Sequence, residues 1–249
     1  MMTNPAAPTT TSLENPIAVM QRFELKYIMS PAQTAQLKRA MEGHMEPDMF
    51  GLTSIASLYY DTPDYRLVRA SLEKPAFKEK LRLRSYGMAT ETSPVYLELK
   101  RKAEGIVYKR RVQTTVPQAA DFLAGAGLLG PAGQINREIT RFRDFYGDLI
   151  PACLIIYDRT AYVEPGGDLR LTIDGNPRFR MDHLTLTYSM EGRSLLPPGC
   201  SILELKVQNG MPLWLSRALC EAKIYKTSFS KYGEAYRMEL QQRAMRSAS

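Results

Sequence analysis

Segments in which charged and apolar residues alternate place the strongest constraint on the fold of this chain. The segment KEKLRLRSYG, residues 78–87, carries a lysine or arginine at every second position up to Arg84, and Leu81 and Leu83 lie between them. Alternation with period two is typical of a β-strand, whose successive side chains point to opposite faces. The cations of such a strand would stand in a row, about 6.6 Å apart. One strand of this kind usually turns its charges to water, so this segment alone favours a solvated face over a polyanion site.

The same alternation recurs along the chain, and this repetition strengthens the case for a polyanion site over a solvated face. Charged residues share one face in FELKY (23–27), in LELK at 97–100 and again at 203–206, and in LRLTID (169–174). Arg159 lies in the middle of YDRTAY, and in VYKRRV either Lys109 and Arg111 or Arg110 alone lies on the charged face. Two architectures produce this pattern: an open sheet with its charges in water, or a closed sheet with its charges inside. Buried cations without counter-ions are prohibitively costly, so the closed sheet requires a water-filled tunnel and a polyanionic ligand.

The order of the expected elements predicts an α+β protein. Strands at hairpin spacing, with helices at both ends and in the middle, indicate an antiparallel closed β-tunnel of about eight strands with helices packed outside and at the ends. We expect a disordered tail over residues 1–17, which is rich in Pro, Thr and Ala, and a single domain over 18–245. The expected strands are 20–29, 54–62, 76–86, 94–101, 106–115, 153–164, 168–176 and 200–207, and the expected helices are 32–41, 64–72, 117–123, 135–146, 213–221 and 232–245.

Composition and charge limit the classes of molecule that this protein could bind. The net charge of +7 permits an anionic partner. The basic residues alternate with aliphatic residues and form no aromatic platform, which argues against nucleic acid. Three scattered cysteines and two histidines make a zinc site improbable. No apolar run is long enough to cross a membrane, and the first residues do not resemble a signal peptide, so we expect a soluble, cytoplasmic protein without direct membrane insertion.

Three glutamates on the charged strand faces need a role of their own. Glu24, Glu98 and Glu204 would only weaken the binding of an anion, unless they hold a metal ion. Mg²⁺ and Mn²⁺ prefer carboxylate oxygens, water and phosphate. A basic tunnel with a few carboxylates is what a metal-assisted triphosphate site requires.

The ordered set of motifs resembles a known family. RFELKY, SLYYDT, KLRLRSYG, YLELK, VYKRRV, YDRTAY, LRLTID, ILELKV and SFSKY follow one another as they do in VTC-type polyphosphate polymerase domains, which belong to the triphosphate tunnel metalloenzyme superfamily. The resemblance covers about residues 20–236. Each motif alone is weak, but the ordered set is specific.

The resemblance implies roles for individual residues. The expected catalytic phosphate-binding residues are Lys26, Arg82, Arg84, Lys100, Arg159 and Arg170. Glu204 matches the glutamate that holds the catalytic Mn²⁺ or Mg²⁺, and Glu98 and Glu24 are expected beside it. Ser230 and Lys231 match the end of the late motif, but Ser228 stands where the family often has a lysine, so Lys226 is expected to substitute. The remaining expected substrate-binding residues are Lys80, Lys109, Arg111 and Lys206.

The resemblance also implies an activity. The family reaction transfers the γ-phosphate of ATP to a growing inorganic polyphosphate chain, so ATP and polyphosphate are the expected partners. By analogy with the family, a membrane-protein partner is conceivable. Two alternatives remain open: a triphosphatase or polyphosphatase, in which water accepts the phosphoryl group, and a non-catalytic polyphosphate-binding module. The second alternative would have no need of a metal-binding glutamate at position 204.

Overall fold

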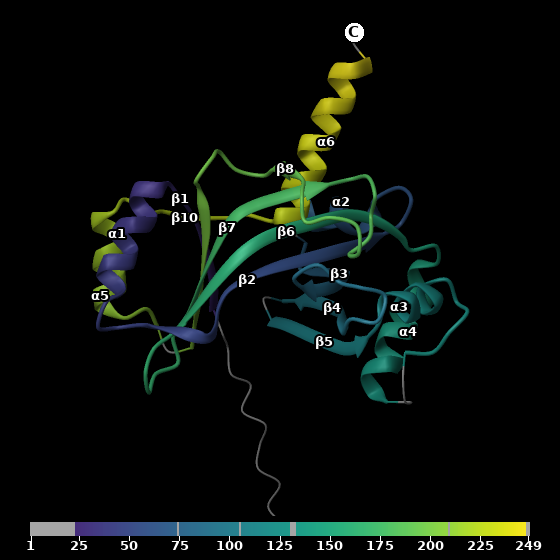
Figure 1. The fold of residues 1–249 in the computed structure, drawn as a ribbon, viewed down its shortest axis with the longest axis horizontal. Coiled ribbons are helices and arrows are strands. Elements are labelled where there is room, and N and C mark those ends of the chain that lie inside the picture. The colour runs from purple at the N-terminus through teal and green to yellow at the C-terminus, as the bar shows by residue number, and fades with distance from the viewer. Residues whose placement is uncertain (1–22, 74, 105, 130–132, 209, 248–249) are drawn as a thin grey trace, which may run out of the picture.

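A curved antiparallel sheet forms the centre of the computed structural model, which describes residues 23–73, 75–104, 106–129, 133–208 and 210–247 (Figure 1). Its strand order is β10-β1-β9-β7-β6-β2-β3-β4-β5, and β8 pairs with β7. The predicted α+β class and antiparallel tunnel sheet are confirmed, whereas the expected tail 1–17 lies outside the described residues. The eight longer strands are β1 (Phe23–Met29), β2 (Glu46–Asp61), β3 (Phe77–Tyr86), β4 (Val95–Ala103), β5 (Ile106–Thr114), β6 (Ile150–Val163), β7 (Arg170–Arg180) and β9 (Ser201–Val207); β8 (Arg193–Ser194) and β10 (Lys226–Thr227) are short.

The helices cover the outside of this sheet. One pair lies at each end of the molecule, α1 beside α5 and α3 beside α4, while α6 begins near the centre and projects outward (Figure 1). Local signals begin two of them: Ser30 before α1 and Thr115 before α3 each form a capping box with the glutamine three residues later. The helices are α1 (Pro31–Met41), α2 (Arg66–Leu72), α3 (Val116–Leu123), α4 (Gln134–Tyr146), α5 (Leu213–Glu221) and α6 (Lys231–Ser247).

The leucines of the alternating strands face the helices, which decides between the two architectures. One cluster packs Leu81, Leu83, Leu97 and Leu99 with side chains of α3 and α4, among them the buried Phe122. A second cluster packs leucines of β7 and β9 with α1 and α5. Because burying each such side chain contributes about 1.5–3 kcal/mol, the leucine face is fixed outward. The alternating charges must therefore line the concave side of the sheet.

Some elements differ from the sequence prediction. β2 begins at Glu46 rather than near residue 54, and its register with β6 shifts between Pro47 and Leu52. This irregularity, together with Gly51, hid the first half of the strand from a search for alternation. β8 and β10 were not predicted, because two residues carry no periodic signal. No helix in the described ranges is long and apolar enough to cross a membrane.

Candidate functional site

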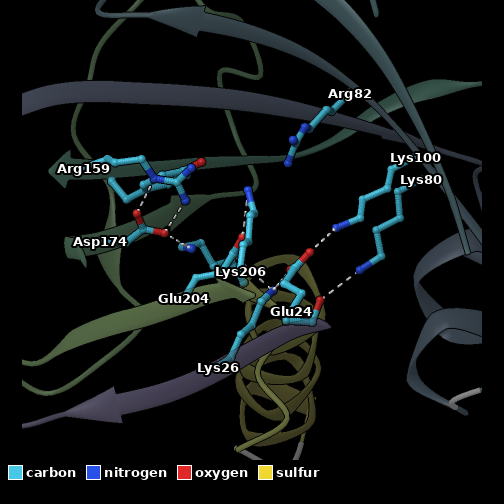
Figure 2. Close-up of polar contacts among 12 residues, drawn as sticks. Glu24, Lys26, Lys80, Arg82, Lys100, Arg159, Asp174, Glu204 and Lys206 are labelled. Atoms are coloured by element: carbon cyan, nitrogen blue, oxygen red, sulfur yellow. Dashed lines mark hydrogen bonds and ion pairs between the residues drawn. The ribbon is translucent and has the colours of Figure 1, made fainter. Parts of the chain in front are cut away.

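Side chains from strands at opposite ends of the sheet meet across its concave face. Lys100 of β4 donates a hydrogen bond to Glu24 of β1 (3.3 Å), and Lys80 of β3 donates one to Ser230, which precedes α6 (3.0 Å). In Figure 2, Lys80, Arg82 and Lys100 reach in from one side, and Glu24 and its neighbours reach in from the other. We call these two contacts the seam. The curved sheet and the seam together enclose a tunnel.

Four cations surround one carboxylate on the side formed by β3, β4 and β5, which we call the arginine wall. Glu98 is only 1% exposed; its Oε2 accepts from Arg82 (2.7–2.8 Å) and lies 3.7 Å from Arg84 Nε. Its Oε1 lies 2.7 Å from Lys109 Nζ and 3.6 Å from Arg111 Nε. Burial alone would raise the pKa of Glu98, but the arginines and Lys109 outweigh it and lower the pKa to about 2. Glu98 is therefore an ionised counter-ion, and the wall keeps an excess of positive charge.

The opposite side, formed by β1, β9 and β7, carries more carboxylates, and we call it the carboxylate wall. Lys26 Nζ lies between Glu24 (3.4 Å) and Glu204 (3.8 Å), and Glu204 also faces Lys206 (3.5 Å). Burial disfavours the Lys26 ammonium, but Glu204 and Glu24 outweigh it and raise the pKa of Lys26. Burial likewise opposes the Glu24 carboxylate, yet Lys100, Lys26 and Lys206 lower its pKa to about 2. Two carboxylates thus converge on one ammonium group.

The three glutamates differ in how well they suit a divalent cation. Arg82 and Lys109 each approach an oxygen of Glu98 to 2.7 Å, whereas the nearest cations lie 3.3 Å from Glu24 and 3.5 Å from Glu204, so the metal-binding role expected of Glu98 is less favoured than that of the other two. Glu24 and Glu204 fit better, because Mg²⁺ is commonly bound by one or two carboxylates together with substrate phosphates. Thr172, the cross-strand partner of Glu204, adds a buried hydroxyl oxygen that makes no hydrogen bond within the described ranges. The described residues contain no group of three or more His, Cys, Asp or Glu that could hold a metal, so substrate oxygens would have to complete the shell.

Asp174 is a tunnel residue that the sequence analysis did not select. It is fully buried and accepts from Arg159 through both carboxylate oxygens (2.6 and 2.8 Å), and from Lys231 (2.5 Å; Figure 2 shows the Arg159 pair). Burial would raise its pKa, but Lys231 and Arg159 outweigh burial and lower it. Asp174 therefore holds two expected phosphate-binding residues in place. Its parity with Arg170 in LRLTID was the signal that could have found it.

Two tyrosine hydroxyls accept hydrogen bonds from arginines of the arginine wall. Arg82 donates to the Tyr59 hydroxyl (3.0 Å), and Arg84 donates to the Tyr157 hydroxyl (3.2 Å). Burial raises the pKa of Tyr59, but Arg82 and the neighbouring Lys80 and Arg84 lower it to about 8. Burial lowers the pKa of Lys80 to about 8; Tyr59 opposes this shift, and three nearby lysines add to it. Tyr59 and Lys80 can thus change protonation state close to neutral pH.

The strand register places two further expected site residues, Arg170 and Lys226. Arg170 is exposed at the beginning of β7, in register with Lys206. Lys226 of β10 pairs with Tyr27, whose side chain packs on the helix side of the sheet. Because directly opposed residues point to the same face, the register argues against the expected phosphate contact of Lys226. Thr227, opposite Lys26, takes the tunnel-facing position instead.

Comparisons with known proteins agree with this architecture. The family model of the VTC domain matches residues 21–239. A solved structure of a putative adenylate cyclase from Bacillus halodurans is similar, with 14% sequence identity, a TM-score of 0.53, and coverage of 85% of this chain and 96% of that one. A putative adenylyl cyclase from Hippeastrum, described as revealing a dominant triphosphatase activity, has 18% identity, a TM-score of 0.46, and coverage of 84% and 92%. No curated protein matches the chain.

The matched range includes nearly all the described elements and every residue of both walls. The fold that carries this match is a curved antiparallel sheet with rows of cations on its concave face. The chain belongs to the VTC domain family, as the ordered motifs predicted.

Proposed function

We propose that this protein is a metal-dependent polyphosphate polymerase that transfers the γ-phosphate of ATP to an inorganic polyphosphate chain. The observation that carries the proposal is the inward-facing set of cations on both walls, in a chain of the VTC domain family. A site that holds several phosphates in line needs several positive charges along its length, and the two walls supply them. Their positions on rigid strands supply the orientation that phosphoryl transfer requires.

The arginine wall would hold the transferred phosphate. Guanidinium groups bind phosphate oxygens bidentately, and the excess charge of this wall is ready to neutralise the charge that develops at the phosphorus. Arg82 and Arg84 are held by Glu98 and by the hydroxyls of Tyr59 and Tyr157, so their orientation is fixed before the substrate arrives. Lysines of the seam and the carboxylate wall would contact the neighbouring phosphates as point charges.

The carboxylate wall would hold Mn²⁺ or Mg²⁺ through Glu204, together with Glu24. When bound, the ion neutralises phosphate charge and helps to keep the reacting oxygens in line. The terminal oxygen of the polyphosphate chain forms the new bond to the γ-phosphorus, and the bond to the bridging oxygen breaks, so that ADP leaves. Because the acceptor is already an anionic oxygen, this reaction needs no protein nucleophile or base.

Hydrolysis is the second candidate, and one observation favours it. Lys80 Nζ lies on the concave face, 3.0 Å from Ser230 Oγ, and burial lowers the pKa of Lys80 to about 8, so above this pH its neutral amine could accept a proton from water. Such a base would assist hydrolysis, whereas it would have no role in the polymerase reaction.

Incubation of the protein with ATP and Mn²⁺, followed by gel electrophoresis and a phosphate assay, tests both candidates. The proposal expects a polymer that an exopolyphosphatase degrades, together with stoichiometric ADP. Orthophosphate without polymer would identify a hydrolase. Retention of polyphosphate without turnover of ATP, in Mn²⁺ and in Mg²⁺, would identify a binding module.

A further inference from the structure

A cavity of about 640 Å³ continues the tunnel from the arginine wall to the surface. Its inner part is lined by Arg84 and Arg159, which belong to the cation set of the tunnel. Its outer part is lined by Phe50, Tyr86 and Tyr96, and it reaches solvent where Phe50 is 72% and Tyr86 48% exposed. We call this outer part the aromatic mouth. Its composition differs from the rest of the tunnel, which is lined mainly by charged side chains.

The aromatic mouth presents flat surfaces suited to a planar group. Tyr86 and Tyr96 meet edge to face, with ring centroids 5.9 Å apart. The guanidinium of Arg111 lies 3.6 Å from the centre of the Tyr96 ring and donates a hydrogen bond to the Tyr86 hydroxyl (3.0 Å). Aromatic rings and guanidinium planes are the surfaces on which nucleobases stack.

A second feature of the mouth disfavours phosphate there. Asp48, half-buried, lines the same cavity, and its carboxylate accepts a hydrogen bond from the backbone N–H of Phe50 (3.0 Å). A carboxylate repels a phosphate, but it accepts hydrogen bonds from hydroxyl and amino groups. The cavity is therefore cationic at its inner end and aromatic with an acceptor at its outer end.

We infer that the aromatic mouth is the nucleoside subsite of the tunnel. A ligand that fills the cavity carries phosphates at Arg84 and Arg159, and a hydroxyl-bearing group with a planar ring at Asp48, Tyr86 and Tyr96. A nucleoside triphosphate has this sequence of groups, whereas inorganic polyphosphate does not. The inference rests on the proposed function for its phosphate end, and it adds which end of the tunnel receives the donor nucleotide.

Calorimetric titration with two probes, inorganic tripolyphosphate and a non-hydrolysable ATP analogue, tests this assignment. Tyr96→Leu keeps apolar volume but removes the ring face, and Phe50→Ala changes an exposed side chain that folding does not require. The affinity of each variant for the ATP analogue should fall about tenfold, because stacking on one aromatic ring has roughly this effect. The affinity for tripolyphosphate should stay within about twofold of the unmodified protein. Tyr188→Leu, which removes an exposed ring stacked on His183, is the matched control and should change neither.

Each other outcome has a distinct meaning. Unchanged affinity for the ATP analogue in both variants would overturn the nucleoside subsite and leave the proposed function standing. Equal losses for both probes would also overturn it, because the aromatic side chains would then only support the arginines. Failure of the unmodified protein to bind either probe would overturn the phosphate tunnel and the subsite together.

Discussion

The arginine wall and the carboxylate wall face the same tunnel, yet they balance charge in opposite ways. On the arginine wall, one buried carboxylate, Glu98, lies within 4 Å of four cations, so this wall carries a net positive charge. On the other wall, Glu24 and Glu204 share Lys26, and their oxygens also face neighbouring lysines. The comparison teaches that the local ratio of cations to carboxylates, more than their number, separates a surface that grips phosphate from one that can offer oxygens to a metal.

The largest effect should follow from removing the single counter-ion of the arginine wall. In Glu98→Gln, four cations lose a buried partner, and breaking a buried ion pair from one side costs about 3–5 kcal/mol of unfolding free energy. Tripolyphosphate supplies replacement anionic oxygens, so it should stabilise this variant more than the unmodified protein. Urea denaturation with and without tripolyphosphate measures both effects.

Glu138→Gln is the matched control for this prediction. Glu138 pairs with Arg101 and Arg110 on the outer side of the same strands and is partly exposed. Its loss should cost less than about 1 kcal/mol, and tripolyphosphate should not compensate for it. Equal costs for the two variants would remove the distinction between Glu98 and an ordinary surface ion pair.

On the carboxylate wall, Glu204→Gln should separate turnover from binding. Loss of a metal-holding oxygen should lower the rate of ATP turnover roughly 100-fold or more, while tripolyphosphate affinity stays within about twofold. Rate measurements over a Mn²⁺ titration, beside calorimetry, test this, with Glu221→Gln on the exposed side of α5 as the control. Unchanged turnover would move the metal to another carboxylate, with Glu24 the first to examine.

Arg82→Ala should weaken tripolyphosphate binding about 30- to 150-fold, because a charge-assisted bidentate contact contributes about 2–3 kcal/mol. Arg110→Ala, on the outer face of the neighbouring hairpin, should change binding by less than about twofold. The rise in melting temperature caused by excess tripolyphosphate measures the difference. Equal rises in both variants and in the unmodified protein would show that the inward row does not grip phosphate.

The smallest expected effect concerns pH and Lys80. An anionic ligand favours the Lys80 ammonium, whose pKa is about 8 in the free protein, so binding takes up a proton as pH rises above this value. Tripolyphosphate affinity should therefore fall about 3- to 10-fold from pH 7 to pH 9, relative to Lys80→Met. Tyr59→Phe shows how much of the change belongs to the tyrosine. Parallel pH profiles for Lys80→Met and the unmodified protein would contradict the prediction.

Alternation predicted which side of each long strand lines the tunnel, because a strand allows only two faces. It could not choose between Arg110 and the pair Lys109 and Arg111. The structure decides this choice, since Arg110 bonds Glu138 outside while Lys109 and Arg111 face Glu98 inside. The apolar pattern of VYKRRV is too short to fix its register.

The sequence alone could not predict which side chains from different strands come together. The crowding of cations around Glu98 depends on the register that sets Arg82, Glu98 and Arg111 side by side across three strands. Register arises from pairing between distant segments, and the type of a single residue does not predict it. The aromatic mouth was missed for a related reason, because Phe50 lies in the irregular half of β2, where alternation fails.

The seam gives the tunnel a property that an uninterrupted barrel lacks. Lys80 and Lys100 link the two sides through side-chain contacts with Ser230 and Glu24. An anionic ligand in the tunnel would compete for the same two ammonium groups, so the contacts that join the two sides of the sheet are also contacts that binding would rearrange.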